Sequence, residues 1–472
     1  MKSKYKDLSI NTLIFTISSF GSKFITFFFV PLYTAVLSTS EYGNVDLMTT
    51  TAQLLIPVLT LNVQDAVLRF TLDKEYKKED VITVSSRIIG ISAAGLFVIL
   101  CIIKWKNIFN LTDNYLIFLF FAYVMGTVNN SLSMYLKSTN QMKLIGVCGV
   151  VNTIIACIAN IILLLVIKEG VNGYMIAYIA GTFVANVGMF VFGHIWRDLK
   201  HGKWNKNIAK AMFAYGTPLV VNSIAWWVNN ASDRYILTFF CGTALNGIYS
   251  VSYKIPSILS LIQTTFYNAW SVSAITEYDK NDSDGFIGNV FTLYSAACIM
   301  CCSGIMLFNI FIASFLYTND FFVAWKYVPL LLVGTVFNGL GLFVGCIFTA
   351  VKRTKDISIT TLIGAGINTI LNFALIPFLG ATGAAFATLI GYFMVFVVRL
   401  NRLKGIIKMK VNWLPFVFSL IVLTLQCIFA TFIESSFIQL PCVIIILLIN
   451  RRLFVKIIIV IRNKTVKLIT KK

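Results

Sequence analysis

The sequence predicts an all-α polytopic membrane protein with about fourteen membrane-spanning helices. Of its 472 residues, 58% are hydrophobic and 12% are charged, whereas an average soluble domain has roughly 25% charged residues and under half apolar ones. Runs of Ile, Leu, Val and Phe recur along the whole chain and are separated by short polar segments. The hydrophobicity is therefore not one anchor on a soluble body, and nearly all of the protein is expected to lie in the membrane.

Apolar stretches of about 20 residues, the length that a helix needs to cross a bilayer, divide the chain into fourteen candidate spans. The first stretch follows the basic opening MKSKYK and is too long for the core of a cleavable signal peptide, so we expect it to stay. The fourteen predicted spans begin near residues 9, 45, 83, 115, 144, 172, 211, 247, 287, 323, 357, 382, 412 and 437. The main alternative is a chain with twelve spans.

The distribution of basic residues predicts the orientation of these spans. If the N-terminus is cytoplasmic, most of the 39 lysines and arginines fall in the N-terminal segment, the even-numbered loops and the C-terminal tail. Such a bias is the positive-inside pattern, and it places both termini in the cytoplasm. The exported loops hold only Lys104, Lys106, Lys168 and Lys326.

Several function classes are disfavoured by the same residues. The net charge of +20 is scattered over short loops, with no folded domain to present a nucleic-acid-binding face. There is no Walker A motif. The ten cysteines lie almost all in apolar segments without nearby histidines, which favours small core residues over metal ligands. We expect no enzyme activity, no metal and no cofactor, and any work must come from gradients or from partners.

Two parts of the chain resemble each other in sequence. GVNGYMIAYIAG at 170–181 matches GATGAAFATLIG at 380–391 with constant spacing, and VNTII at 151–155 matches INTIL at 367–371. An ordered series of such matches predicts two halves in the same orientation, because six spans return the chain to its starting side. Weaker matches pair SKFITFFF (22–29) with DRYILTFF (233–240), and SEYGNVD (40–46) with LNGIYSV (245–251).

This repeat predicts three parts of the chain. Residues 1–205 form an N-terminal six-helix bundle, and 206–405 form a second, parallel six-helix bundle. Residues 406–472 add helices thirteen and fourteen and a basic cytoplasmic tail. Parallel repeats build a cleft between two bundles, which is the usual place for a transported solute.

Basic residues inside the spans predict what that cleft binds. A cation at the centre of a spanning helix costs roughly 2.5 to 3.5 kcal/mol on insertion scales, so it needs water or a partner. Lys23 lies too deep in its span to reach the interface fully, whereas Arg234 and Lys254 lie closer to the exported ends, where an ion pair is an alternative. With Arg69 near the cytoplasmic mouth, these residues predict a central cationic cavity that attracts an anionic substrate.

Acidic residues and prolines accompany these cations. Asp46 and Asp65 of the second span and Asp233 of the seventh are candidate countercharges or ion-coupling carboxylates. A surface position is the alternative for Asp46, Asp65 and Arg69. Proline bends a helix and is tolerated in membranes beside a cavity or a neighbouring helix. The candidate hinges for alternating access, for which a static kink is the alternative, are Pro31, Pro57, Pro218 and Pro256.

Three segments resemble the polysaccharide flippases of the multidrug, oligosaccharidyl-lipid and polysaccharide (MOP) exporter superfamily. They are FVPLYTAVLSTSEYGNVDL near the start, NNASDRYILTFFCGTALNGIYSVSYKIPSIL in the middle and NTILNFALIPFLGATGAAFATLIGY late in the chain. The resemblance extends over about residues 8–455. The DRY segment with the downstream GIYSVSYK and the LGATGAA turn are its more specific parts.

This resemblance implies a V-shaped pair of bundles with the first, second, seventh and eighth helices lining the cleft. It implies coupling to a proton or sodium gradient and a location in the bacterial cytoplasmic (inner) membrane. It also implies a function, namely moving undecaprenyl-diphosphate-linked oligosaccharides, such as O-antigen (lipopolysaccharide) or capsule repeat units, from the cytoplasmic to the outer leaflet. In family terms Lys23, Arg234 and Lys254 lie on helices lining this cavity, where they would hold the diphosphate or acidic sugars. A polysaccharide polymerase and a chain-length regulator would be partners.

Other functions remain open at this point. A peptidoglycan-precursor (lipid II) flippase shares the fold and an anionic lipid-linked cargo. A multidrug or cation antiporter of the same superfamily would offer acidic groups to its substrate, whereas the deep charges here are mainly basic. A membrane glycosyltransferase or polymerase would carry acidic motifs or large extracellular loops, and the sequence has neither.

Overall fold

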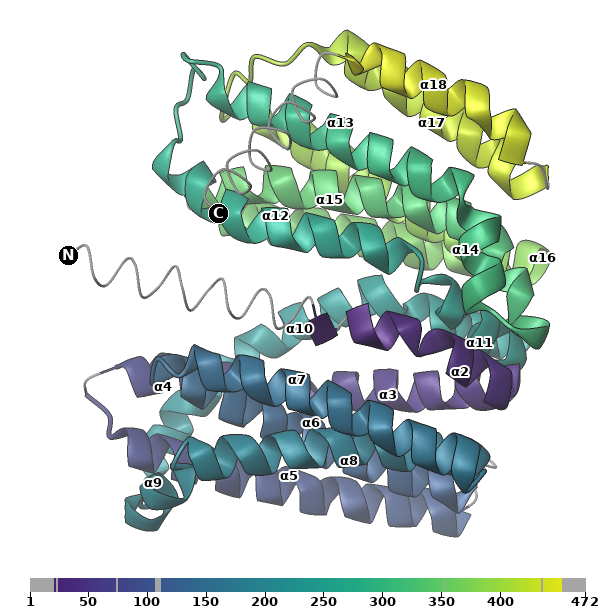
Figure 1. The fold of residues 1–472 in the computed structure, drawn as a ribbon. Helices are drawn as coiled ribbons and strands as arrows, with labels where there is room; N and C mark the ends of the chain where they lie inside the picture. Colours follow the sequence, from purple (N-terminus) through teal and green to yellow (C-terminus); the bar gives the residue numbers. More distant parts are fainter. Residues whose placement is uncertain are drawn as a thin grey trace, which may run out of the picture. The chain divides into compact units, whose positions relative to one another are not determined.

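The computed structural model describes residues 21–451, apart from Lys23, Lys74, 107–111, Lys352 and 434–435, and these residues form helices and no strand (Figure 1). A π-helical turn at Ile161–Val166 extends α7, and 3₁₀ turns occur at Asn319–Lys326 and Ser436–Gln439. The α-helices are α2 (Val30–Val36), α3 (Thr39–Leu59), α4 (Val63–Leu72), α5 (Lys78–Lys106), α6 (Asp113–Ser138), α7 (Met142–Asn160), α8 (Gly170–Phe192), α9 (Ile195–His201), α10 (Lys206–Cys241), α11 (Thr243–Ser252), α12 (Pro256–Thr276), α13 (Phe286–Leu307), α14 (Asn309–Leu316), α15 (Val328–Ala350), α16 (Thr354–Leu403), α17 (Trp413–Phe432) and α18 (Leu440–Ile449).

The helices confirm an all-α, multi-pass membrane protein. In the described ranges, eight helices are long and apolar enough to cross a membrane, or nine if α3 and α4, which meet at a 53° bend, form one span. The predicted spans after the first coincide with one or two of the helices each, except those near 357 and 382, which are the two parts of α16. The start of the first span lies outside the described residues. Helices α10 and α12 have sufficient length but are more polar. The count of fourteen spans stays a prediction.

By its internal packing the chain divides into two compact units. Unit 1 runs to Tyr235 and includes Gly242–Gly247, and unit 2 comprises Ile236–Cys241 and the chain from Ile248 onward. The division falls inside α10, whose larger part packs with unit 1. The bundles expected at 1–205 and 206–405 and the extra pair at 406–472 stay predictions.

Unit 1 is organised around α6, which packs against α3, α4, α5 and α8. Its two hydrophobic clusters contain the fully buried rings of Tyr123 and Tyr135. Tyr123 donates its hydroxyl hydrogen to Ser92 over 2.8 Å, and Tyr135 donates to Asp198 of α9 over 2.7 Å. The two phenols thus satisfy the rule that a buried polar group needs a hydrogen-bond partner.

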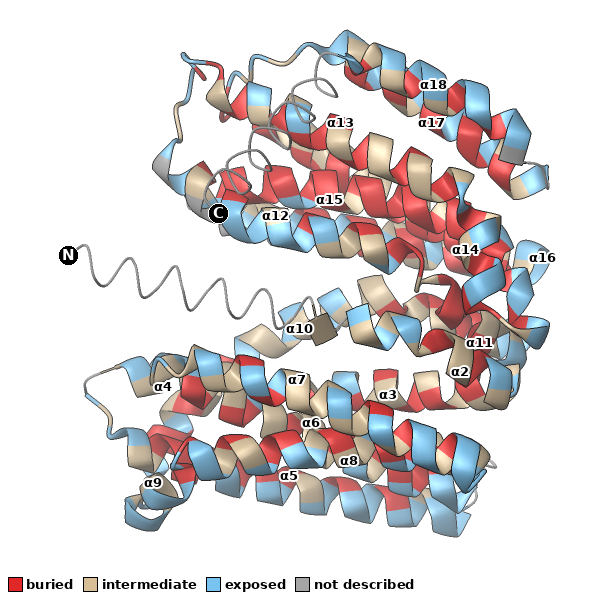
Figure 2. Cartoon of the chain, viewed as in Figure 1, coloured by how far each residue is buried: buried red, intermediate tan, exposed pale blue. Residues whose placement is uncertain are grey.

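Unit 2 is organised around α15, which packs against α12, α13, α16 and α17. Figure 2 shows α15 as a largely buried helix, and 83% of the residues in its most apolar stretch are buried. The ring of Trp270 stacks on Phe343 at 4.3 Å between centroids and donates its indole N–H to the Phe343 carbonyl over 3.1 Å. This aromatic contact fixes α12 against α15.

The repeated glycines occupy equivalent places in two helical hairpins. Helix α8 packs along α7, and the two parts of α16 pack together because the chain reverses at Gly380. Gly170 and Gly380 both have positive φ, 57° and 53°, at the hairpin turns, a conformation that favours glycine. A side chain at Gly181 would collide with Asn152, and one at Gly391 would collide with Asn368. The sequence match between the two hairpins is therefore confirmed in structure.

Helix α16 also carries a buried cation that the sequence did not predict. Arg399 is 5% exposed. Its Nη1 donates to the Gly341 carbonyl over 2.7 Å, and its Nε and Nη2 donate to the hydroxyls of Thr360 and Thr361, each over 3.0 Å. These acceptors lie on α15 and on the first part of α16, so one side chain joins three helical segments.

Arg399→Lys is expected to lower the free energy of unfolding by about 1–3 kcal/mol. An ammonium cannot reproduce the planar fork of the guanidinium, and a buried polar group that loses its partner costs about that much. Thermal unfolding in detergent micelles measures the effect. Arg402→Lys is the matched control, because Arg402 pairs with Asp356 while remaining 36% exposed in its side chain. Equal stability of the two variants would contradict the structural role of Arg399.

Candidate functional site

The candidate site is an ion pair inside unit 1. Arg234 of α10 places Nη1 at 2.7 Å from Asp46 Oδ1 on α3. The two side chains are only 21% and 15% exposed. The same nitrogen donates to the hydroxyl of Thr50 over 3.3 Å. Because Asp46 and Thr50 lie four residues apart on one face of α3, they receive the guanidinium together.

Local sequence fixes where α3 begins and so where Asp46 lies. Ser38 is the N-cap of α3: its hydroxyl accepts the N–H of Glu41, and the Glu41 carboxylate accepts the Ser38 N–H over 2.8 Å. This reciprocal capping box satisfies two of the free N–H groups at the helix start. It sets the register that directs Asp46 toward α10.

Further contacts hold α10 against α3 beside the pair. Trp227 donates its indole N–H to the carbonyl of Thr50 over 3.0 Å, and the Tyr235 and Thr51 hydroxyls are 2.6 Å apart. The rings of Trp227 and Tyr235 lie 5.2 Å apart. The guanidinium of Arg234 is therefore held in a position set by several hydrogen bonds.

The chain around the ion pair contains a very close helix crossing. A side chain on Gly43 would collide with the Thr243 carbonyl, and one on Gly247 would collide with the Thr39 carbonyl. Asn246 adds a hydrogen bond from its amide to the Gly43 carbonyl over 3.2 Å. Glycine permits this approach because it lacks Cβ, so α3 and α11 cross at backbone contact one turn from Asp46.

This arrangement can bind an anion at the expense of the ion pair. Arginine offers five N–H donors in a planar fork that suits phosphate and carboxylate oxygens. In the structure Asp46 and Thr50 accept from one of its nitrogens. An incoming phosphate would compete with Asp46 for the guanidinium, so the carboxylate sets how tightly the cation is held.

The other predicted site residues lie elsewhere or outside the described part. Lys254 is half-buried in the turn between α11 and α12, in unit 2. Arg69 is 58% exposed in its side chain and lies 3.7 Å from Asp73 on the surface of α4. Asp65 accepts the amide of Asn62 over 2.7 Å. Asp233 is 4% exposed and accepts the N–H of Arg234 over 2.9 Å. Lys23 lies outside the described residues.

The hinge candidates occupy two kinds of position. Pro57 and Pro218 lie inside α3 and α10, where proline removes a backbone hydrogen bond. Pro57 is close to the 53° bend between α3 and α4. Pro31 and Pro256 lie in the first turns of α2 and α12, positions where proline fits without loss. Their role as hinges stays a prediction.

Thr50, Thr51 and Tyr235 are site residues that the sequence reasoning missed. The available signal was the spacing of four between Asp46 and Thr50, which puts two oxygen acceptors on one helix face. Nothing in the sequence paired Tyr235 with Thr51, because the pairing depends on how α10 lies on α3. Within the described residues no three His, Cys, Asp or Glu side chains could together hold a metal ion.

Comparison with known proteins places the chain in a family. Residues 8–271, more than half of the sequence, match the family described as "Polysaccharide biosynthesis protein". A curated relative from Haloferax volcanii, the "Probable low-salt glycan biosynthesis flippase Agl15", is 24% identical over 213 residues. That alignment covers 43% of this chain and 44% of the relative, so the chain matches less than half of the relative's length.

Solved structures show the fold. "Lipid II flippase MurJ, inward closed conformation" aligns with a TM-score of 0.66 at 16% identity, over 95% of this chain and 100% of that one. An inward-facing multidrug resistance MATE family transporter of the MOP superfamily aligns with a TM-score of 0.64 at 12% identity, over 83% and 98% of the two chains. The chain therefore belongs to the polysaccharide biosynthesis protein family and has the fold of the MOP superfamily.

Proposed function

We propose that the protein is a flippase, not an enzyme, that moves lipid-linked oligosaccharides across the membrane. Its substrates are undecaprenyl-diphosphate-linked repeat units of the O-antigen or capsule type, carried from the cytoplasmic to the outer leaflet. The observation that carries this proposal is the Asp46–Arg234 pair, a guanidinium inside the helical bundle beside a competing carboxylate. The family description and the printed name of the Haloferax relative, a probable glycan biosynthesis flippase, support it.

The physical task explains the need for such a cation. A diphosphate-linked sugar must pass a hydrocarbon layer of about 30 Å, while its polyprenyl tail can stay in lipid. A guanidinium held at 2.7 Å from Asp46 is already desolvated in part, so exchange of the carboxylate for a diphosphate replaces one charged partner by another. Arg234 binds the diphosphate, and Asp46 recovers the cation after release.

The remaining elements of the proposal follow from the sequence. Two bundles rock about hinges at Pro31, Pro57, Pro218 and Pro256 in an alternating-access cycle across fourteen spans. Lys23, Lys254 and Arg69 extend the cationic path for the diphosphate and acidic sugars. A proton or sodium gradient acting on Asp46, Asp65 or Asp233 supplies the energy. Both termini are cytoplasmic, in the inner membrane of a bacterium, and a polymerase with a chain-length regulator uses the product.

The lipid II flippase is the second candidate, because that structure aligns over nearly all of this chain. Its cargo is also an anionic lipid-linked glycan, so a cation in the bundle suits both. A cation antiporter suits the site less well, since an arginine repels a cationic substrate.

A reconstituted flipping assay tests the proposed function. The full-length protein in liposomes is given an undecaprenyl-diphosphate oligosaccharide, lipid II or a cationic dye, and exposure to a membrane-impermeant hydrolase or quencher is followed. We expect the oligosaccharide lipid to be translocated at least tenfold faster than in protein-free vesicles. Transport of lipid II alone would establish the second candidate, and transport of the dye alone would reject an anionic substrate.

A further inference from the structure

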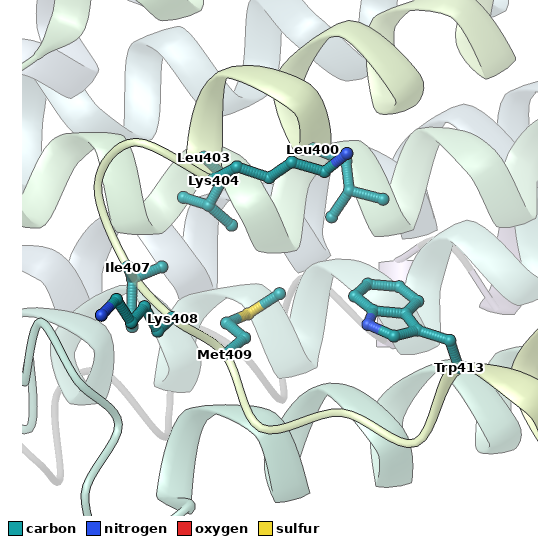
Figure 3. Close-up of a pocket in the computed structure, with 7 residues that line it drawn as sticks. All are labelled: Leu400, Leu403, Lys404, Ile407, Lys408, Met409 and Trp413. Carbon is teal, nitrogen blue, oxygen red and sulfur yellow. The ribbon is translucent and has the colours of Figure 1, made fainter.

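Unit 2 contains a pocket that the proposed function does not use. Its cavity volume is about 490 Å³, and it lies where α16 ends, the following loop turns and α17 begins (Figure 3). The residues around it combine apolar side chains with two lysines. They are Leu400, Leu403, Lys404, Ile407, Lys408, Met409 and Trp413.

The loop that forms the pocket is held rigidly. The Lys408 N–H donates to the Lys280 carbonyl over 3.0 Å, and the Tyr278 hydroxyl donates to the Ile406 carbonyl over 3.0 Å. The Lys410 N–H donates to the buried Asp282 carboxylate over 3.0 Å, and its ammonium donates to the Ser283 carbonyl over 2.7 Å. The segment between α16 and α17 is therefore fixed on the loop that precedes α13.

The two lysines of the pocket have no acidic partner. Within the described part of the chain, the ammonium groups of Lys404 and Lys408 make no ion pair and no hydrogen bond. Figure 3 shows the Lys404 side chain extended along the rim toward Leu400, and Lys408 on the far side of Ile407. Two positive charges therefore lie at the edge of an apolar floor, a combination that suits an amphiphile with an anionic head.

Two acidic side chains of the neighbouring loop, Asp279 and Asp282, are already committed to hydrogen bonds. Asp282 accepts the N–H groups of Ile287 and Gly288, besides that of Lys410. Asp279 accepts the N–H groups of Ser283 and Asn281, which keep the pKa of its carboxyl below the usual value. These carboxylates stabilise the loop and do not line the pocket.

Helix α17 presents exposed apolar side chains beside the pocket. Trp413 packs against Phe291 and Phe416, with ring centroids 5.6 and 5.9 Å away, yet it is 37% exposed. The next residues outward, Leu414 and Phe418, are 75% and 54% exposed. Tryptophan is enriched at the membrane–water interface, and lysines in loops mark the cytoplasmic side. With the orientation predicted from the basic loops, the pocket would lie at the level of the cytoplasmic headgroups, beside acyl chains.

We propose that this pocket binds an anionic glycerophospholipid of the cytoplasmic leaflet. Lys404 and Lys408 bind the headgroup phosphate, and an acyl chain lies over Met409 and Trp413 toward the exposed face of α17. Basic pockets between transmembrane helices on the cytoplasmic side bind anionic headgroups by this chemistry. The site is separate from the Asp46–Arg234 pair, and its test does not depend on transport.

Binding of defined lipids to the purified, delipidated full-length protein tests the proposal. Native mass spectrometry compares phosphatidylglycerol with phosphatidylcholine of identical acyl chains. We expect the double variant K404Q/K408Q to weaken phosphatidylglycerol binding about 30-fold and to leave phosphatidylcholine binding unchanged. The matched control K200Q/K203Q removes the same charge from the exposed basic segment at the end of α9 and should change binding less than twofold.

A second variant tests the apolar part of the pocket without changing charge. Met409→Trp fills the floor and should weaken phosphatidylglycerol binding about tenfold. Quenching of the protein's tryptophan fluorescence by brominated phosphatidylglycerol should be smaller in Trp413→Phe than in the wild type, because the other seven tryptophans remain. Equal losses in K200Q/K203Q would show diffuse surface charge instead of a site and overturn the proposal. The proposal would also be overturned if inorganic phosphate competed as effectively as the lipid. The same holds if only undecaprenyl diphosphate showed an affinity that depended on the pocket.

Discussion

Gly247→Leu is expected to prevent stable folding of unit 1. A side chain at this position would collide with the Thr39 carbonyl, and the obstacle is backbone, which cannot move aside as a flexible side chain would. Overpacking costs about 1–3 kcal/mol even where neighbours adjust. We expect Gly247→Ala to lose about 3 kcal/mol and Gly247→Leu to yield no monodisperse protein. Thermal unfolding and size-exclusion chromatography in detergent measure the two outcomes.

Gly149→Ala and Gly95→Ala are the matched controls for this crossing. Both glycines lie inside helices, and a Cβ at either position would meet nothing within 4 Å. Because alanine is the better helix former by about 1 kcal/mol, these variants should be as stable as the wild type or more so. If Gly247→Ala matched them, the close crossing of α3 and α11 would not be essential to the fold.

Arg234→Met is expected to destabilise the protein by about 3–5 kcal/mol, because it leaves the Asp46 carboxylate partly buried and unpaired. The double variant Asp46→Leu/Arg234→Met should recover most of that loss, since replacing both charges by apolar groups is often close to neutral. A double-mutant cycle of unfolding free energies gives the coupling between the two side chains.

A surface pair provides the comparison for this cycle. Arg69 and Asp73 lie 3.7 Å apart, and the Arg69 side chain is 58% exposed. Exposed pairs contribute about 0–1 kcal/mol, so the corresponding cycle for Arg69 and Asp73 should give little coupling. Equal coupling in both cycles would mean that the Asp46–Arg234 pair is no more desolvated than a surface contact.

Much of the helical architecture was predictable because local sequence determines it. The apolar runs in the sequence predicted where most of the long helices lie along the chain. The matched glycines identified two hairpins, since a positive φ at Gly170 and Gly380 is a local backbone property. Pro57 indicated a disturbance in α3, which the structure places just before the bend to α4.

The candidate site was only partly predictable. Arg234 and Asp46 were both identified as charges in spans, but the sequence could not show that they pair, because they are 188 positions apart and meet only when α10 packs on α3. Arg399 was missed for a related reason. It lies near a basic loop in sequence, whereas its acceptors come from α15 and the first part of α16.

The lysine pocket escaped sequence analysis as well. Lys404 and Lys408 read as ordinary residues of a basic cytoplasmic loop, which satisfies the positive-inside pattern without a binding role. Only the hydrogen bonds that fix the loop beside α13 bring them to the edge of an apolar floor closed by Trp413.

Transport by charge variants at position 234 is the most direct test of the proposed role of Arg234. The rate at which reconstituted protein exposes an undecaprenyl-diphosphate oligosaccharide is measured for wild type and for Asp46→Asn. It is then measured for Arg234→Lys and Arg234→Gln, each combined with Asp46→Asn to keep the site free of an unpaired carboxylate. We expect Arg234→Lys to keep at least a tenth of the Asp46→Asn rate and Arg234→Gln to fall at least 100-fold below it. Equal rates in the lysine and glutamine variants, with all proteins folded, would show that the cation at this position does not bind the diphosphate.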